Sequence, residues 1–237
     1  MSDEGGVEPT EGQPAVEQLP LFPLSAVLFP GAPLPLQIFE ERYRILVRDL
    51  LELEPAQRRF GVVAIEAGSE AGMALPQMSP VGCEARVERI EPLPDGRSRL
   101  LAYGGARFRL LEVDTVSKPY LIGRVRWLDE PSGEPGIADA LVPAVHTALR
   151  AYVETLAALT GGNVDHDELP DDAAELSYVT AGAILLGLRE RQALLELGDT
   201  ATRLRTEVGL LRRERLLMAE LRAVNAPELF RMARSPN

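Results

Sequence analysis

The stretch Leu19–Asp49, LPLFPLSAVLFPGAPLPLQIFEERYRILVRD, decides the fold that the sequence predicts. It interleaves five prolines with large apolar side chains, and proline lacks the backbone N–H that a sheet ladder uses. Leu19–Leu24 and Leu34–Phe39 are therefore predicted to be strands in which proline meets a sheet edge or a bulge. The Pro30-Gly31 pair between them is typical of a tight turn. Apolar residues then recur at helical spacing, so the stretch predicts strand, turn, strand and amphipathic helix.

Further short strands are predicted downstream, because apolar β-branched runs or apolar–polar alternation recur between Gly and Pro corners. These segments are Phe60–Ile65, Val81–Ile90, Arg99–Tyr103, Arg107–Val113 and Tyr120–Leu128. Pro94-Asp95-Gly96 is typical of a hairpin turn, and Gly104-Gly105 is expected to break the chain between two strands. We expect a small closed or nearly closed β structure with one early helix.

The second half of the chain has helical patterns. It follows a predicted linker, Asp129–Gly136, and begins with an apolar stripe from Leu141 to Leu159. Asp172 and Asp199 are predicted to cap later helices, the second of them long, and a final short helix is expected around Pro227. We therefore expect a subdomain of three or four helices.

The composition is that of an ordinary globular protein with an acidic balance. The formal net charge is −11, and the chain stays acidic without its N-terminal tail, which weighs against a nucleic-acid partner held through phosphates. No apolar run approaches the roughly 20 residues of a membrane helix, and the N-terminus lacks the features of a signal peptide. The single cysteine, Cys83, excludes an intrachain disulfide. We expect a cytoplasmic protein with no membrane partner.

Few residues have the spacing that chemistry needs. His146 and His166 lie on different elements, and the acidic run from Asp165 to Asp172 lacks the glycine of a calcium loop. Cys83 falls on the apolar face of a strand, where it behaves as a small hydrophobe. We predict no catalytic residue, no metal and no cofactor. A possible basic stripe alternates with apolar residues, which favours a surface or ion-pair role over RNA binding; it comprises Arg107, Arg109, Arg124 and Arg126.

Three segments in order resemble the N-terminal, substrate-binding (LON) domain of Lon proteases. They are LPLFPL with LFPGAPLPLQIFEERY and RILVRD, then VGCEARVERIEPLPDGRSRLLAYGGARFRL, and then LSYVTAGAILLGLRERQALLELGDTATRLRTEVGLL. The resemblance covers about residues 18–225. It implies an α+β fold, with a PUA-like β pseudo-barrel followed by a C-terminal helical bundle subdomain.

This resemblance sets the expected domain organisation. Residues 1–17 are predicted to be a disordered acidic tail, because they are poor in large apolar side chains. The LON domain is expected over 18–225, with a β subdomain at 18–128 and a helical subdomain at 137–225. Residues 226–237 are expected to form a C-terminal tail.

The enzymatic parts of a Lon protease are not expected here. Full-length members of that family add an ATPase module and a Ser-Lys peptidase module. The chain has no GxxxxGK[ST] phosphate loop, and its only lysine, Lys118, is next to Ser117, so the two side chains of an extended segment point to opposite sides. We expect a free-standing, non-enzymatic LON domain.

The expected function is binding of unfolded or apolar polypeptide segments, or docking to a protein partner such as a proteolysis component. The alternative is a structural interaction or oligomerisation module without client recognition; a hydrolase and an RNA binder rank lower. The candidate peptide-binding surface is placed on the early hairpin and first helix, where proline-rich strands are expected at an edge. It comprises Phe22, Leu28, Phe29, Phe39 and Tyr43. An architectural role is the favoured interpretation of Tyr43, and Phe108 is expected to fill the barrel.

Overall fold

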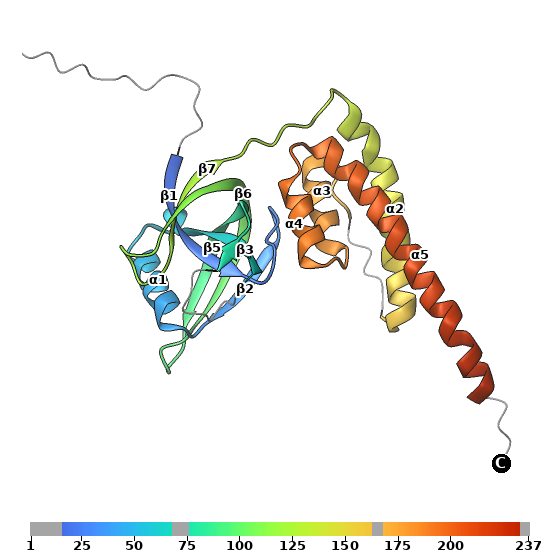
Figure 1. Ribbon diagram of the computed structural model, residues 1–237, viewed down its shortest axis with the longest axis horizontal. Coiled ribbons are helices and arrows are strands. Elements are labelled where there is room, and N and C mark those ends of the chain that lie inside the picture. The colour runs from blue at the N-terminus through green and yellow to red at the C-terminus, as the bar shows by residue number, and fades with distance from the viewer. Residues whose placement is uncertain (1–15, 68–75, 163–167, 233–237) are drawn as a thin grey trace, which may run out of the picture.

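Five strands close into a barrel in the computed structural model, which describes residues 16–67, 76–162 and 168–232 (Figure 1). The sheet order is β1-β7-β6-β5-β3, and a parallel pairing of β1 with β3 closes it. The barrel strands are β1 (Val16–Leu24), β3 (Arg59–Ala67), β5 (Val81–Pro92), β6 (Ser98–Asp114) and β7 (Ile122–Trp127). β2 (Pro33–Ile38) pairs with β6, and the short β4 (Gln77–Met78) pairs with β3. The α1 helix (Glu41–Leu51) and a 3-10 turn (Pro55–Gln57) follow β2.

Strand β1 is not a sheet edge, which corrects one expectation. It pairs with β7 through residues 16–20 and with β3 through residues 21–24, so it has a partner along its whole length. Strand β2 does lie at an edge. Ala32 O accepts a hydrogen bond from Gly104 N of β6 (2.9 Å), and backbone groups alternate sides along a strand. Pro33 and Pro35 therefore face the open edge, where a missing N–H breaks no ladder bond.

Strand β6 runs unbroken through Gly104-Gly105, so the expected break there is wrong. A Cβ on Gly104 would collide with the backbone oxygen of Phe29, and one on Gly105 with the carboxylate of Glu84. Both glycines are needed because other groups approach the strand closely, and not because the chain turns. The expected turns are confirmed at Gly31 (φ 75°) and Gly96 (φ 77°).

Two apolar clusters fill the β half. Phe108 is fully buried inside the barrel among Leu19, Leu21, Val63 and Val125, as expected. The second cluster lies under α1, where the ring of Phe22 stacks on that of Tyr43 at a centroid distance of 3.9 Å. The amphipathic face predicted for the first helix therefore closes the barrel wall.

Four helices form the second half: α2 (Ile137–Thr160), α3 (Ala173–Ala183), α4 (Leu188–Glu196) and α5 (Thr200–Met232). Helices α2 and α5 lie side by side, and α4 is the helix that faces the barrel (Figure 1). The predicted caps are confirmed, because Asp172 Oδ1 accepts from Glu175 N and Asp199 Oδ1 from Thr202 N (both 2.8 Å). None of the helices in these ranges is long and apolar enough to cross a bilayer.

Helix α5 is longer than expected. It continues through Pro227 to Met232, where a separate short helix and a C-terminal tail were predicted. A proline inside a helix removes one backbone hydrogen bond and can bend the helix without ending it. The expected acidic tail lies outside the described residues, apart from residues 16 and 17, which begin β1.

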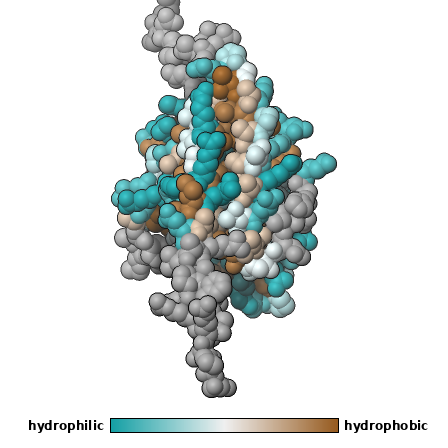
Figure 2. Space-filling model, turned by 90° about the vertical axis from the view of Figure 1, so that its right-hand side faces the viewer, coloured by the Kyte–Doolittle hydropathy of each residue, from teal (hydrophilic) through white to brown (hydrophobic). Residues whose placement is uncertain are grey.

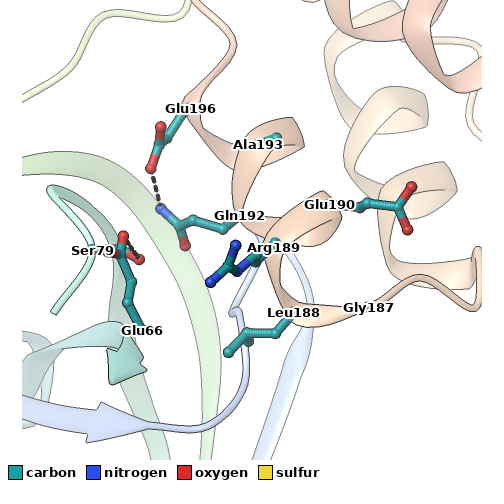
Figure 3. Close-up of a pocket in the computed structure, with 9 residues that line it drawn as sticks. All are labelled: Glu66, Ser79, Gly187, Leu188, Arg189, Glu190, Gln192, Ala193 and Glu196. Carbon is teal, nitrogen blue, oxygen red and sulfur yellow. Dashed lines mark hydrogen bonds between the residues drawn. The ribbon is translucent and has the colours of Figure 1, made fainter. Parts of the chain in front are cut away.

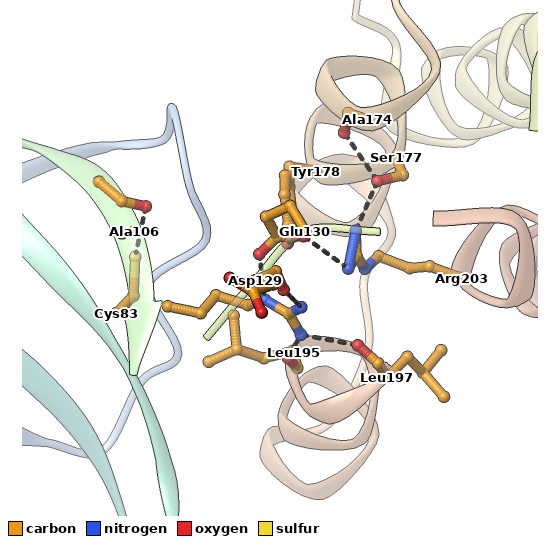
Figure 4. A network of polar contacts seen from close by, with 12 residues as sticks. Cys83, Ala106, Asp129, Glu130, Ala174, Ser177, Tyr178, Leu195, Leu197 and Arg203 are labelled. Carbon is orange, nitrogen blue, oxygen red and sulfur yellow. Dashed lines mark hydrogen bonds and ion pairs between the residues drawn. The ribbon is translucent and has the colours of Figure 1, made fainter. Parts of the chain in front are cut away.

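The two halves are joined by a largely buried polar network, which we call the junction network: Arg107, Glu130, Tyr178 and Arg203. Figure 4 shows Glu130 between Tyr178 and Arg203. Arg107 of β6 is only 1% exposed, which corrects its placement on a solvated face. Its Nη1 donates to the backbone oxygens of Leu195 (2.7 Å) and Leu197 (2.6 Å) at the end of α4. The alternation of side chains along β6 correctly predicts that Arg107 and Phe108 lie on opposite faces of the strand. The face that carries Arg107 was expected to meet water, but the helical half covers it.

Glu130 is the anion at the centre of the junction network. It pairs with Nε of Arg107, and its Oε2 accepts from Tyr178 OH (2.6 Å) and Arg203 Nη2 (3.4 Å). Arg203 is fully buried and lies 4.0 Å above the ring of Tyr178. The segment between the two halves is therefore held by β6, α3 and α5, because it supplies the carboxylate that both arginines need.

Replacing Arg107 with methionine should destabilise the protein strongly. The change leaves the buried Leu195 O and the partly buried Leu197 O without this donor, and each buried acceptor left unpaired costs about 1–3 kcal/mol. Glu130, which is partly exposed, loses one partner but keeps Tyr178 and Arg203. Urea denaturation monitored by circular dichroism measures the loss. Arg109→Met is the matched control, since Arg109 is an exposed arginine of the same strand and should change stability by less than about 0.5 kcal/mol. Equal effects of the two variants would contradict the role of Arg107.

A second buried charge lies on α5, one turn beyond Arg203. Glu207 is fully buried, and neither of its carboxylate oxygens has a hydrogen-bond partner among the described residues. Burial raises the pKa of Glu207 well above its ordinary value of 4.5, although the charge of Arg203 acts in the opposite direction. The folded protein therefore holds a proton that the unfolded chain releases.

The Glu207→Gln variant should become more stable than the wild type as the pH rises. A carboxyl with a raised folded pKa contributes stability that is present below its unfolded pKa and is lost as the pH rises through the folded pKa. Glutamine mimics the protonated form and does not titrate. The melting temperatures of the two proteins, measured from pH 4 to pH 8, should coincide at the acid end. As the pH rises, the melting temperature of the variant should increasingly exceed that of the wild type. A constant difference across this range would contradict a raised pKa.

Candidate binding cleft

A cleft of about 750 Å³ opens between α4 and the β3–β4 side of the barrel (Figure 3). We call it the α4 cleft. Glu66 of β3 and Ser79, which follows β4, line the barrel side. The helix side comprises Gly187, Leu188, Arg189, Glu190, Gln192, Ala193 and Glu196. The cleft therefore lies where the barrel meets the helical half.

The helix wall follows from the amphipathic pattern of α4. Leu194 and Leu195 are buried against a cluster that includes Phe29 and Val81, so the other face of the helix is left to line the cleft. Gln192 connects α4 to the barrel by hydrogen bonds. Its Nε2 donates to Val81 O of the barrel (2.9 Å) and to Glu196 Oε1 (2.7 Å).

The barrel wall is held by a smaller set of hydrogen bonds. Ser79 N donates to Ala64 O (2.9 Å), and its hydroxyl donates to Glu66 Oε1 (2.9 Å). Gln77 Nε2 donates to the other oxygen of the same carboxylate (3.2 Å). These bonds hold Glu66 on the cleft side of β3.

The cleft has apolar surface and an excess of negative charge. Leu188 and Ala193 supply the apolar part, and three glutamates face a single arginine, Arg189. Glu190 is neutralised by Arg213 (2.7 Å), which lowers the pKa of that carboxyl. The lining residues include no histidine, cysteine or lysine.

A family model decides what kind of domain this is. The model of the ATP-dependent protease La (LON) substrate-binding domain matches residues 18–213. The chain belongs to the LON substrate-binding domain family. The resemblance read from the sequence is thereby confirmed, and so is the α+β fold that it implied.

Several proteins similar to this LON domain are Lon proteases. The chain is 27% identical over 202 residues to Lon protease 2 of Myxococcus xanthus and 27% identical over 210 residues to Lon protease of Anaeromyxobacter dehalogenans. These matches cover 84% and 88% of this chain but only 24% of each relative. The chain therefore spans about a quarter of the length of these curated relatives.

Solved structures with similar folds are also Lon N-terminal domains. The Lon N-terminal domain protein from Xanthomonas campestris is 28% identical, with a TM-score of 0.55, and the match covers 81% of this chain and 98% of that one. The N-terminal domain of Mycobacterium avium complex Lon protease has a TM-score of 0.61 at 17% identity, over 83% and 98% of the two chains. The second likeness shows the fold alone.

The structure corrects most of the surface predicted from the sequence. Phe22, Leu28, Phe29 and Tyr43 are all at least 92% buried, so they are core residues of the LON domain and not an exposed edge. The reason is that β1 has partners along its whole length and α1 covers Phe22 and Leu28. Phe29 is covered by the helical half, where it packs with Tyr178 and the α4 leucines. Phe39 is 64% exposed, and its role in binding stays a prediction.

None of these five residues lines the α4 cleft. Sequence reasoning missed the helix wall, although the run RQALLE at residues 191–196 was among the motifs that carried the family resemblance. Its polar and apolar residues fit an amphipathic helix, but they do not say which part of the chain lies against either face. That information exists only in the tertiary structure.

The remaining chemistry-bearing residues have structural environments. Cys83 is fully buried, and burial raises the pKa of its thiol well above the ordinary value. His146 Nε2 lies 2.9 Å from Pro170 O. The described ranges hold no cluster of His, Cys, Asp or Glu suited to a metal ion. His166, Asp165 and Asp167 lie outside the described residues.

Two phenylalanine variants should separate core from surface. Phe22→Asp removes a buried ring, which alone costs about 3–5 kcal/mol, and buries a charge in its place, so its melting temperature should fall steeply. Phe39→Asp changes an exposed side chain and should shift stability by less than about 0.5 kcal/mol. Differential scanning calorimetry of both proteins gives the comparison. A stable, fully folded Phe22→Asp protein would show that the hairpin is not core.

Proposed function

We propose that this LON domain is a non-enzymatic binding module for polypeptide segments, and that the α4 cleft receives them. The proposal rests on the presence and the position of the cleft. It lies at the junction of barrel and helices in a chain whose family model is that of a substrate-binding domain. A volume of about 750 Å³ falls within the range of pockets that hold small ligands, so it suits a few residues of a chain and not a folded protein.

The lining supports recognition of a flexible chain. Leu188 and Ala193 offer apolar contact, while glutamates and Gln192 offer hydrogen-bond acceptors. A mixed surface of this kind can bind both the side chains and the backbone of an extended segment. The open edge of β2 is less suitable, because Pro33 and Pro35 present no N–H to an added strand.

The absence of catalysis is part of the proposal. A Ser-Lys dyad at Ser117 and Lys118 is opposed by their contacts, since the two residues bond to different carboxylates. Lys118 Nζ pairs with Asp49 Oδ2 (2.8 Å), and Ser117 N donates to Asp114 Oδ1 (3.1 Å). Cys83 is closed to solvent and its thiol is held protonated by burial.

The biological role that fits this activity is delivery of clients to proteolysis. The similar proteins are Lon proteases, whose length is about four times that of the matched region. We propose unfolded or apolar polypeptide segments as clients, a cytoplasmic location, and no nucleic-acid or membrane partner. The acidic balance of the chain, with a net charge of −11, supports the exclusion of nucleic acid.

The alternative is a module that only oligomerises or docks to one partner. One observation favours it: apolar side chains form a stripe among hydrophilic ones on the helical face (Figure 2). Leu216 and Leu217 of α5 are 67% and 48% exposed. Light scattering of the purified protein separates the two functions, because a self-associating module forms oligomers without any client.

Filling the α4 cleft should abolish client binding and leave folding intact. Ala193 is exposed on α4 and lines the cleft, so Ala193→Trp places a large ring where a peptide would lie. Affinity for reduced, carbamidomethylated ribonuclease, which stays unfolded, should fall about tenfold or more, equivalent to roughly 1.4 kcal/mol. Fluorescence anisotropy measures it.

The matched control is Ala140→Trp, which adds the same ring to an exposed alanine of α2. It should bind the unfolded ribonuclease as the wild type does. If Ala193→Trp binds equally well while its melting temperature is unchanged, the α4 cleft is not the binding site.

A further inference from the structure

We propose that the α4 cleft contains a subsite for one positively charged side chain, arginine or lysine, of the bound polypeptide. This inference rests on the proposed function and adds a specificity to it. A buried, unpartnered oxygen and two carboxylates without a cation face the same cleft.

The unpartnered oxygen belongs to Gln192. This residue is 93% buried, and its Oε1 has no hydrogen-bond partner among the described residues. Its Nε2 donates to both Val81 O and Glu196 Oε1, so both amide hydrogens are in use and the amide cannot reverse without losing two bonds. Figure 3 shows the oxygen turned toward the space between α4 and the Ser79–Glu66 pair. An orphaned buried acceptor of this kind is stabilised by a ligand that brings a donor.

The two carboxylates are those of Glu66 and Glu196. Glu66 accepts from Ser79 and Gln77, and Glu196 accepts from Gln192, so these hydrogen bonds all come from neutral donors. No lysine or arginine of the described residues forms an ion pair with either of them. Glu190, the third glutamate of the cleft, differs because Arg213 neutralises it. The cleft therefore offers negative charge beside the orphaned oxygen.

A basic side chain fits both parts of this lining. Its aliphatic stem can lie along Leu188 and Ala193 while its head group donates to the acceptors. Arginine suits the site better than lysine, because its planar guanidinium presents five donors to several acceptors at once. Neutral side chains can donate hydrogen bonds but bring no positive charge, and acidic side chains are repelled by the two carboxylates, so the subsite discriminates by charge.

Arg189 of this chain opposes the entry of a basic side chain into the α4 cleft. It is exposed, lines the same cleft and forms no ion pair with another described residue, so its positive charge repels an incoming basic side chain. Removing this positive charge should strengthen binding of a cationic ligand.

The test uses two fluorescein-labelled decapeptides of Gly, Ser, Leu and Ala that differ in one central residue, arginine or its neutral isostere citrulline. With the wild-type protein the arginine peptide should bind about tenfold more tightly, since hydrogen bonds to charged groups are the stronger kind. Arg189→Gln should increase the preference for arginine. The Glu66→Gln/Glu196→Gln variant keeps one acceptor oxygen at each position but loses the charges, and it should abolish the preference.

The control variant is Glu154→Gln, which makes the same chemical change at an exposed glutamate of α2 and should keep the preference for arginine. Equal affinity of wild-type protein for the two peptides overturns the subsite and leaves the proposed polypeptide binding in place. Failure to bind either peptide, together with failure to bind the unfolded ribonuclease, overturns both. The wild-type comparison decides the subsite even if a variant does not fold.

Discussion

A single buried guanidinium holds the helical half of this LON domain against its barrel. Arg107 leaves the outer face of β6 and donates to the last carbonyls of α4, while Glu130 supplies the opposite charge. Arginine loses its hydration when it is buried, so it is stable there only if its donors are all matched. This need fixes where α4 ends relative to the barrel. The wall of the α4 cleft therefore depends on a residue that does not touch the cleft, and the second tie, from Gln192 to Val81, completes the arrangement.

In this arrangement apolar residues fill the core, whereas polar residues line most of the cleft. The proline-rich hairpin is rich in aromatic and aliphatic side chains, yet nearly all of them are buried, either in the barrel, under α1 or against the helical half. The α4 cleft is lined mainly by polar side chains of α4 and by Glu66 and Ser79 of the barrel. A LON domain that binds polypeptides in this cleft would recognise the charge and the hydrogen-bond donors of the polypeptide as well as its apolar surface. The reason is that the most apolar segment of the domain is already buried.

The prolines of β2 have a protective effect as well as an architectural one. An unpaired strand edge can recruit another strand, and a protein that handles unfolded chains meets many of them. With Pro33 and Pro35 facing outward, the edge of β2 offers carbonyls but few N–H donors. Strand addition is therefore discouraged at that place, which agrees with the proposal that polypeptides bind in the α4 cleft.

The sequence by itself determined the local features of this protein. The turns at Gly31 and Gly96, the caps at Asp172 and Asp199, and the apolar stripe of α2 depend on a few neighbouring residues, so their patterns are legible without a structure. The family resemblance also set the α+β fold. The tertiary structure alone decided the burial of Arg107 and Phe29, the unbroken course of β6 and the position of the α4 cleft. The physical reason is that periodicity tells which residues share a face, whereas burial and function depend on what packs against that face from a distant part of the chain.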